Sequence, residues 1–144
     1  GTSVRTFSLP IIDLEEKEQK VPQLEFPVRI EMSAAVLNEA IEDADIVAEA
    51  VSFIVENNKF SLRAEGDLNT ATIDIPASNE TTIEAKKAVK AKYSVEYLKK
   101  MIEGSKLADR VVLQFNKDYP LKLSYRTVDK VLLEFILAPR VEND

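Results

Sequence analysis

The apolar residues of this chain follow a pattern that occurs twice, and this repeat constrains the fold more than any other feature. From Phe26 onward, a strand with alternating apolar residues leads into a helix with one apolar face, and three further strands follow. The same order of elements begins again at Val89. The two copies share a pattern rather than residues, so they predict a domain with internal pseudo-symmetry.

The first copy is expected to span residues 26–75. Residues 26–32 alternate as a half-buried strand, and Ser33 is placed to N-cap the helix that follows. The apolar face of that helix comprises Leu37, Ala40, Ile41, Ala44 and Val47. Three strands are predicted after it, over residues 51–56, 59–65 and 70–75, and Asn57-Asn58 forms the turn between the first two.

The second copy repeats this order over residues 89–137. Ser94 caps a helix whose apolar face comprises Val95, Leu98, Met101 and Ile102, and Gly104 stands where that helix is expected to stop. Three strands are again predicted, over residues 111–115, 121–125 and 131–137. Short turns between strands, beside helices with one apolar face, predict an α+β domain of antiparallel sheets with both helices on one face.

Two further segments precede the first copy. Residues 4–9 alternate as a strand, so the chain is expected to begin inside a sheet. Residues 10–25 carry charged residues between Pro10 and Pro22 and show neither period, which predicts an exposed linker.

Composition excludes most catalytic chemistry. The 144 residues are enough for one domain, and the chain contains neither His nor Cys. This removes zinc fingers, thiol nucleophiles and the Ser-His-Asp triad, so no catalytic residue, metal or cofactor is expected. No apolar run approaches the roughly 20 residues of a membrane span, and no leader opens the chain, so an intracellular protein is expected.

Carboxylates crowd the first predicted helix. They fall opposite its apolar face and comprise Glu39, Glu42, Asp43, Asp45 and Glu49. A pair of carboxylates is able to support acid/base hydrolysis, which remains a distant possibility, but this placement favours a solvated helix face. Asp43-Ala-Asp45 also lacks the Gly and the terminal Glu of a calcium loop.

Basic residues cluster in a chain whose formal net charge is -6. The cluster comprises Lys86, Lys87, Lys90, Lys92, Lys99, Lys100 and Lys106. Two interpretations stay open, namely ordinary surface charge and contact with the phosphate backbone of a nucleic acid. No aromatic residues are interleaved with the lysines, so stacking on bases is not indicated.

The last apolar segment, residues 135–139, runs into a proline and an acidic end. It fits a core strand with a frayed end. It also fits one wall of a groove that binds an extended or short helical peptide. Periodicity does not separate these two interpretations.

Five stretches of the sequence resemble the DNA sliding clamps of the proliferating cell nuclear antigen (PCNA) type, especially the archaeal ones. Residues 137–142, Leu-Ala-Pro-Arg-Val-Glu, look like the C-terminal signature of that family. The other four are residues 8–14, 21–22, 59–66 and 93–98, in the order in which the family has them. The resemblance extends from about residue 4 to the end of the chain.

This resemblance implies a division of the chain into three parts. Residues 1–9 look like the last strand of an absent N-terminal clamp domain, residues 10–25 like the interdomain connecting loop, and residues 26–144 like the C-terminal clamp domain. In the family, three subunits close a ring around duplex DNA and make a polymerase processive. The resemblance therefore implies a non-enzymatic processivity factor for DNA replication that is located in the cytoplasm or nucleoid if the protein is archaeal.

The resemblance also implies a groove for partner proteins. Family clamps bind polymerases, ligases, flap nucleases and the clamp loader through a Gln-x-x-aliphatic-x-x-aromatic-aromatic peptide. The matching residues here are Val21, Pro22, Pro120, Ile136, Leu137, Ala138, Pro139, Arg140 and Val141. The alternative function is a generic module that binds short peptides and is unrelated to replication.

Two further contacts follow from the resemblance. Ring closure would pair the strand before the connecting loop with a strand in the second domain of a neighbouring subunit. The first strand comprises Val4, Arg5, Thr6, Phe7, Ser8 and Leu9, and the second comprises Thr70, Ala71, Thr72, Ile73, Asp74 and Ile75. Because no domain is present to hold residues 4–9, we expect them to be disordered or to pair with another copy. Non-specific contact with duplex DNA is expected from Lys99, Lys100 and Lys106.

Overall fold

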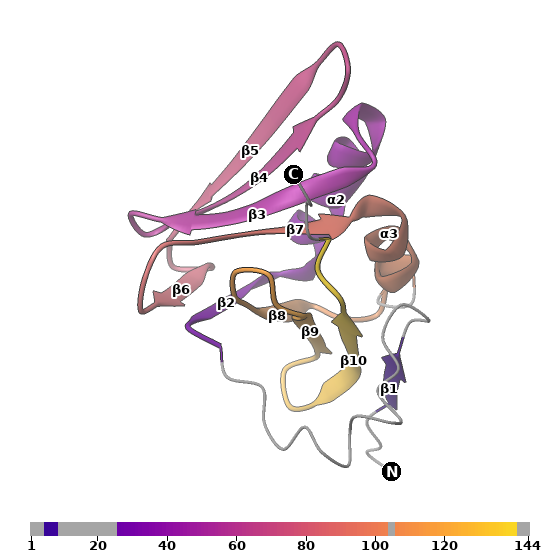
Figure 1. Cartoon of the computed structure of the whole chain (residues 1–144). Helices are drawn as coiled ribbons and strands as arrows, with labels where there is room; N and C mark the ends of the chain where they lie inside the picture. Colours follow the sequence, from indigo (N-terminus) through magenta and orange to yellow (C-terminus); the bar gives the residue numbers. More distant parts are fainter. Residues whose placement is uncertain (1–4, 9–25, 104–105, 141–144) are drawn as a thin grey trace.

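A computed structural model describes residues 5–8, 26–103 and 106–140 of the chain, which form two helices and ten strands (Figure 1). The helices are α2 (Ala34–Val47) and α3 (Val95–Glu103). The strands are β1 (Arg5–Ser8), β2 (Val28–Ser33), β3 (Ala50–Glu56), β4 (Lys59–Glu65), β5 (Thr70–Pro76), β6 (Thr82–Ala85), β7 (Val89–Ser94), β8 (Arg110–Phe115), β9 (Leu121–Arg126) and β10 (Val131–Leu137).

Two sheets contain all ten strands. Strand order is β1-β10-β9-β8-β2-β6 in the larger sheet and β5-β4-β3-β7 in the smaller one. Every pair is antiparallel except β1 and β10, which run parallel. The two helices pack against each other, as Figure 1 shows. The α+β prediction with two pseudo-symmetric units is therefore confirmed.

The two units exchange their first strands. β2, from the first unit, pairs with β8 of the second, whereas β7, from the second unit, pairs with β3 of the first. The junctions between each first strand and its helix are also equivalent in the two units. The Ala34 amide, at the start of α2, donates to the Asp109 carbonyl at 3.0 Å. The Val95 amide, at the start of α3, donates to the Glu49 carbonyl at 2.9 Å. Each unit thus completes the sheet of the other.

Both helices begin at the serines that the sequence predicts. The Ser33 hydroxyl accepts a hydrogen bond from the Val36 amide at 3.4 Å, and the Ser94 hydroxyl accepts one from the Tyr97 amide at 3.5 Å. Side-chain caps of this kind satisfy amides that have no partner inside the helix. α3 ends at Glu103, and Gly104 lies outside the described residues.

An aromatic cluster joins the two sheets at the centre of the core. The Phe53 ring lies 5.7 Å from the Phe115 ring, 5.5 Å from the Phe60 ring and 5.3 Å from the Tyr93 ring, each edge to face. Such pairs each contribute about 0.5–1.5 kcal/mol beyond the area they bury. The side chain of Phe53, on β3, therefore holds β4 and β7 of its own sheet and β8 of the other.

Two sequence-based expectations are corrected. β6 was not predicted, because Thr82–Ala85 is a short edge strand whose residues are mostly exposed and show no clear alternation. The segment before the linker was expected to find no partner in its own chain, yet β1 pairs with β10, whose outer edge would otherwise be open. Linker residues 10–25 lie outside the described part of the chain.

The predicted solvated face of the first helix is confirmed. The carboxylate residues on α2 and just after it, from Glu39 to Glu49, are exposed. The buried face comprises Ala34, Leu37, Ala40, Ile41 and Ala44. Neither helix in the described part of the chain is long and apolar enough to span a bilayer.

Candidate functional site

The end of β10 and the turn between β8 and β9 meet at one end of the larger sheet. Leu137 of β10 pairs with Leu121 of β9, and this register places Pro120 beside Ala138. The residues of the predicted partner groove that remain half-buried here are Pro120, Ile136, Ala138 and Pro139. The register brings Ala138 close to Pro120. These four residues and Arg140 are the described part of the predicted partner groove, and we call them the tail groove.

Four other residues of the predicted groove differ from these. Val21, Pro22 and Val141 lie outside the described residues. The side chain of Leu137 is fully buried in the core, so it supports the strand beneath the tail groove and is not available to touch a bound peptide.

A buried tyrosine holds the turn that carries Pro120. The Tyr93 hydroxyl donates to the Tyr119 carbonyl at 2.8 Å, and the Tyr119 ring meets the Phe26 ring edge to face at 5.7 Å. Burial raises the pKa of Tyr93 far above its usual value, and the charge of Asp118 raises it further. The phenol therefore stays protonated and keeps donating, so β7 and the β8–β9 turn remain tied together.

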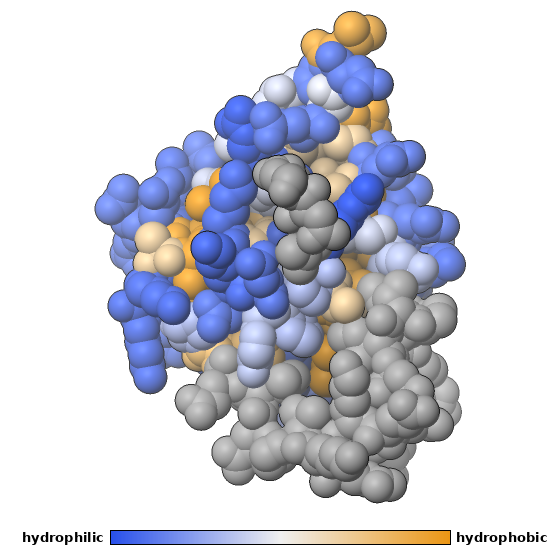
Figure 2. All heavy atoms as spheres, in the orientation of Figure 1, coloured by the Kyte–Doolittle hydropathy of each residue, from blue (hydrophilic) through white to orange (hydrophobic). Residues whose placement is uncertain are grey.

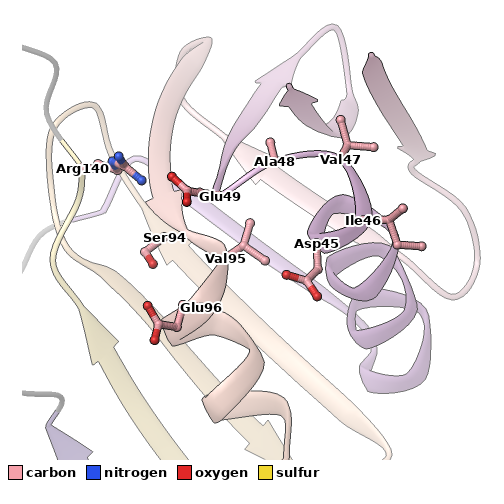
Figure 3. Close-up of a pocket in the computed structure, with 9 residues that line it drawn as sticks. All are labelled: Asp45, Ile46, Val47, Ala48, Glu49, Ser94, Val95, Glu96 and Arg140. Carbon is pink, nitrogen blue, oxygen red and sulfur yellow. The ribbon is translucent and has the colours of Figure 1, made fainter. Parts of the chain in front are cut away.

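Arg140 connects the tail to the smaller sheet. Its backbone amide donates to the Lys92 carbonyl of β7 at 2.7 Å, so the chain crosses from β10 to β7 at this residue. Its side chain borders a hollow of about 450 Å³ between the end of α2 and the start of α3. Figure 3 shows the carboxylates of Asp45, Glu49 and Glu96 around this hollow, with the Arg140 guanidinium at its edge.

The three lysines predicted to face DNA have different surroundings. The Lys99 ammonium group donates to Asp45 of α2 at 2.8 Å, and this hydrogen bond, followed by the charge of Asp45, raises the pKa of Lys99. Lys100 lies 5.4 Å from the centre of the Tyr97 ring, within the range of a cation–π contact, and Lys106 is exposed. The Lys99 ammonium group thus stays charged, and the Asp45 carboxylate balances this charge locally.

The two strands predicted to close a ring lie at the edges of different sheets. β5 is the outer strand of the smaller sheet and pairs with β4 alone, whereas β1 is the outer strand of the larger one. Asp74 on β5 accepts from the Ser61 hydroxyl at 2.7 Å and pairs with Lys59 at 3.7 Å. The chain does not bring β1 and β5 together, and Val4 and Leu9 lie outside the described residues.

The described residues hold no group of three or more acidic side chains that is arranged to bind a metal ion. The carboxylates of α2 are exposed. Neither observation favours acid/base catalysis, since catalytic carboxylates are found where burial or a neighbouring charge shifts the pKa.

Sequence reasoning missed one grouping of basic residues. Lys90 and Lys92 of β7, Lys117 of the β8–β9 turn and Arg140 border one hollow of about 540 Å³. The period-two spacing of Lys90 and Lys92 was a signal that both lie on the same face of a strand. The approach of Lys117 and Arg140 comes from tertiary contacts, which the spacing does not carry.

Comparison with known proteins gives matches along nearly the whole chain. The family model described as "Proliferating cell nuclear antigen, C-terminal domain" matches residues 20–140. The "DNA polymerase sliding clamp" of Thermococcus fumicolans is 41% identical over 145 residues, which cover 99% of this chain and 58% of that protein. "DNA polymerase sliding clamp 1" of Thermococcus kodakarensis is 40% identical with the same coverage, and the sliding clamp of Pyrococcus abyssi is 37% identical.

The chain therefore spans a little more than half the length of these relatives.

Proposed function

This chain belongs to the proliferating cell nuclear antigen family, and on that premise we propose that it is the C-terminal part of a DNA polymerase sliding clamp. In this role it tethers replication and repair enzymes to duplex DNA by encircling the DNA and carries out no catalysis. The observation that carries the proposal is the 41% identity over 99% of the chain to a protein named as such a clamp. The generic peptide-binding module is not favoured, because the matches are to sliding clamps.

Within this proposal, residues 1–9 are the last strand of an N-terminal clamp domain, residues 10–25 the connecting loop and residues 26–144 the C-terminal domain. Subunits join when β1 pairs with the open edge of β5 in a second copy. The exposed edge of β5 supports this arrangement, since an unpaired strand edge is a template for another strand. Light scattering that detects only monomers at high protein concentration would contradict self-association of this chain.

The tail groove is the proposed docking site for partner enzymes. Its half-buried apolar residues, Pro120, Ile136, Ala138 and Pro139, offer an apolar surface to the aliphatic and aromatic positions of a partner peptide. The hydrogen bond from Tyr93 fixes the turn on one side of this surface, and the hydrogen bond of Arg140 to Lys92 fixes the tail on the other. A preorganised groove binds more tightly because less freedom is lost on binding.

Contact with DNA through Lys99, Lys100 and Lys106 is expected to be weak in this chain alone. Asp45 already pairs with Lys99, and exposed carboxylates surround it on both helices. These carboxylates repel phosphate, so this chain alone is expected to bind duplex DNA weakly and in a strongly salt-dependent way. Retention on DNA then depends on ring closure and on the other parts of the ring.

Calorimetric titration with a Gln-x-x-Leu-x-x-Phe-Phe peptide tests the docking function. Pro139→Asp places a charge on the apolar surface of the tail groove and is expected to weaken peptide binding at least 10-fold, because a buried unpaired carboxylate costs more than 1.4 kcal/mol. Pro76→Asp is the matched control, since it makes the same chemical change at an exposed position at the end of β5.

Binding that is lost in Pro139→Asp and kept in Pro76→Asp would support the clamp function. Equal binding by both variants would place the peptide elsewhere on the molecule and contradict the proposed docking site. Circular dichroism of both variants shows whether the fold is intact.

A further inference from the structure

A basic groove lies beside the tail groove, on the face of the smaller sheet that points away from the core. It has a volume of about 540 Å³. Its charged lining comprises Lys87, Lys90, Lys92, Lys117, Asp118 and Arg140. Five cations thus face one carboxylate on a chain whose net charge is -6. This local reversal of sign raises the concentration of anionic ligands at the groove.

Most of these cations have no counter-charge of their own. Lys87, Lys90 and Lys117 form no ion pair among the described residues, whereas lysines elsewhere, such as Lys99 and Lys59, pair with aspartates. Like charges held close together repel one another, and an anionic ligand relieves that repulsion. The groove is therefore suited to a ligand that carries several negative charges.

The spacing of the lysines favours an extended peptide. Val89 and Ala91 of β7 are buried, while Lys90 and Lys92 alternate with them and share the opposite face. Two residues along a strand span about 6.6–6.8 Å, and an extended peptide has the same repeat. Carboxylates at alternate positions of such a peptide match the separation of these two lysines.

Two observations disfavour a nucleic acid as the ligand. Asp118 lies within the groove and repels phosphate, and no aromatic side chain lines the hollow within the described residues, so bases find no stacking surface. A peptide is able to place neutral residues opposite Asp118 and acidic residues opposite the lysines. Arg140 belongs both to this groove and to the tail groove, so one bound segment is able to reach both surfaces.

We infer that the basic groove binds an acidic flank of the partner peptide whose apolar core docks on the tail groove. The inference rests on the proposed docking function, and it adds a preference among partners. Segments with Asp or Glu at alternate positions next to the docking motif bind more tightly than segments with neutral flanks.

The test is a calorimetric titration with three kinds of peptide. The first carries Gln-x-x-Leu-x-x-Phe-Phe with a Glu-Ser-Glu-Ser-Glu flank, made in two versions with the flank at either end. The second replaces each Glu of the flank by Gln, and the third is the acidic flank alone. At low salt, one of the two acidic versions is expected to bind about 3- to 10-fold more tightly than its neutral match, the size expected for two or three solvent-exposed charge pairs, and the gain shrinks as salt rises.

Matched variants locate the effect. Lys90→Gln combined with Lys117→Gln is expected to remove the gain from the acidic flank and to leave the affinity for the neutral peptide unchanged. Lys130→Gln is the control, because Lys130 is exposed in the β9–β10 turn, at the opposite end of β9 from Pro120. It is expected to keep the gain.

The outcomes separate this inference from the proposed function. If the neutral peptide binds and an acidic flank does not increase the affinity, the inference is overturned and the docking function is still supported. If the acidic flank alone binds to the wild type but not to the lysine variant, and the neutral peptide does not bind, the basic groove is supported and the docking function is contradicted. Failure of all three peptides overturns both.

Two other occupants give distinct results. The first is nucleic acid. If a labelled single-stranded oligonucleotide binds more tightly than the acidic peptides, and this binding is lost in the lysine variant, the groove binds nucleic acid and the inference is overturned. A chain that ends at Arg140 lacks Glu142 and Asp144. If the acidic peptides gain affinity only for that shorter chain, the groove belongs to the chain's own acidic residues, and the inference fails.

Discussion

The hydrogen bond from Tyr93 to Tyr119 links the stability of the domain to the shape of the tail groove, and Tyr93→Phe removes it. The Tyr93 ring remains in the aromatic cluster, so the variant loses the 2.8 Å hydrogen bond and little packing. A bond of this kind contributes about 0.5–1.5 kcal/mol net. For a domain of this size the expected fall in Tm is about 2–6 °C. Affinity for the docking peptide should fall as well, because the turn that carries Pro120 loses its tie.

Alkaline pH provides a sharper readout of the same bond. Burial raises the pKa of Tyr93 in the folded state above the value of about 10 in the unfolded chain. Above pH 10 the unfolded chain loses this proton first, so the contribution of Tyr93 is fully present below pH 10 and is lost as pH rises. The loss amounts to about 1.4 kcal/mol per pH unit. Tyr93→Phe has no such proton, so its stability deficit should shrink above pH 10 and reverse by about pH 11.

Urea denaturation of the wild type and the variant at pH 7, 9, 10.5 and 11 measures this. Tyr97→Phe is the matched control, because the Tyr97 hydroxyl donates no hydrogen bond among the described residues. A deficit for Tyr93→Phe that stays constant from pH 7 to pH 11, or no deficit at pH 7, would refute this reasoning.

Three further substitutions have direct consequences. Gly66→Ala would place a Cβ atom 2.2 Å from the Val47 carbonyl oxygen, so the β4–β5 turn must move off the end of α2, and we expect a loss of about 1–3 kcal/mol by urea denaturation. Leu37→Ala leaves a cavity at a fully buried position and should cost about 2–5 kcal/mol in the same assay. Asp45→Asn removes the partner of Lys99, so the pKa of Lys99 falls and retention on immobilised duplex DNA at low salt should rise; unchanged retention would show that Lys99 does not face DNA.

The local elements of this fold were predictable because short-range signals determine them. Ser33 and Ser94 cap the two helices as predicted, and Asn57 and Asn58 both adopt positive φ, of 52° and 61°, in the turn between β3 and β4. Asn tolerates that region of backbone space, so the Asn-Asn pair marked this hairpin. The repeated order of elements came from the same periodicities.

Contacts between distant parts of the chain were not predictable from the pattern. The exchange of β2 and β7 between the two units depends on which strand edges meet, and alternation along a strand does not encode its neighbour. The pairing of Lys99 with Asp45 joins residues 54 positions apart, and a helical wheel of α3 alone suggests only an exposed lysine. The exposure of Leu68 was not predictable either, because this residue lies outside both repeat patterns. Leu68 is in the turn between β4 and β5 and is 94% exposed. The tip of this hairpin is at the top of Figure 2.

In the proposed function, a partner peptide docks on the tail groove of this chain. The most direct test of this docking is a titration of the ¹⁵N-labelled protein with the Gln-x-x-Leu-x-x-Phe-Phe peptide, with the backbone amide resonances followed by NMR. The largest shifts are expected on Ala138 and Arg140, which belong to the tail groove, and on Leu121, which follows Pro120 in the chain. Shifts confined to α2 and α3, or no shifts at millimolar peptide, would contradict it.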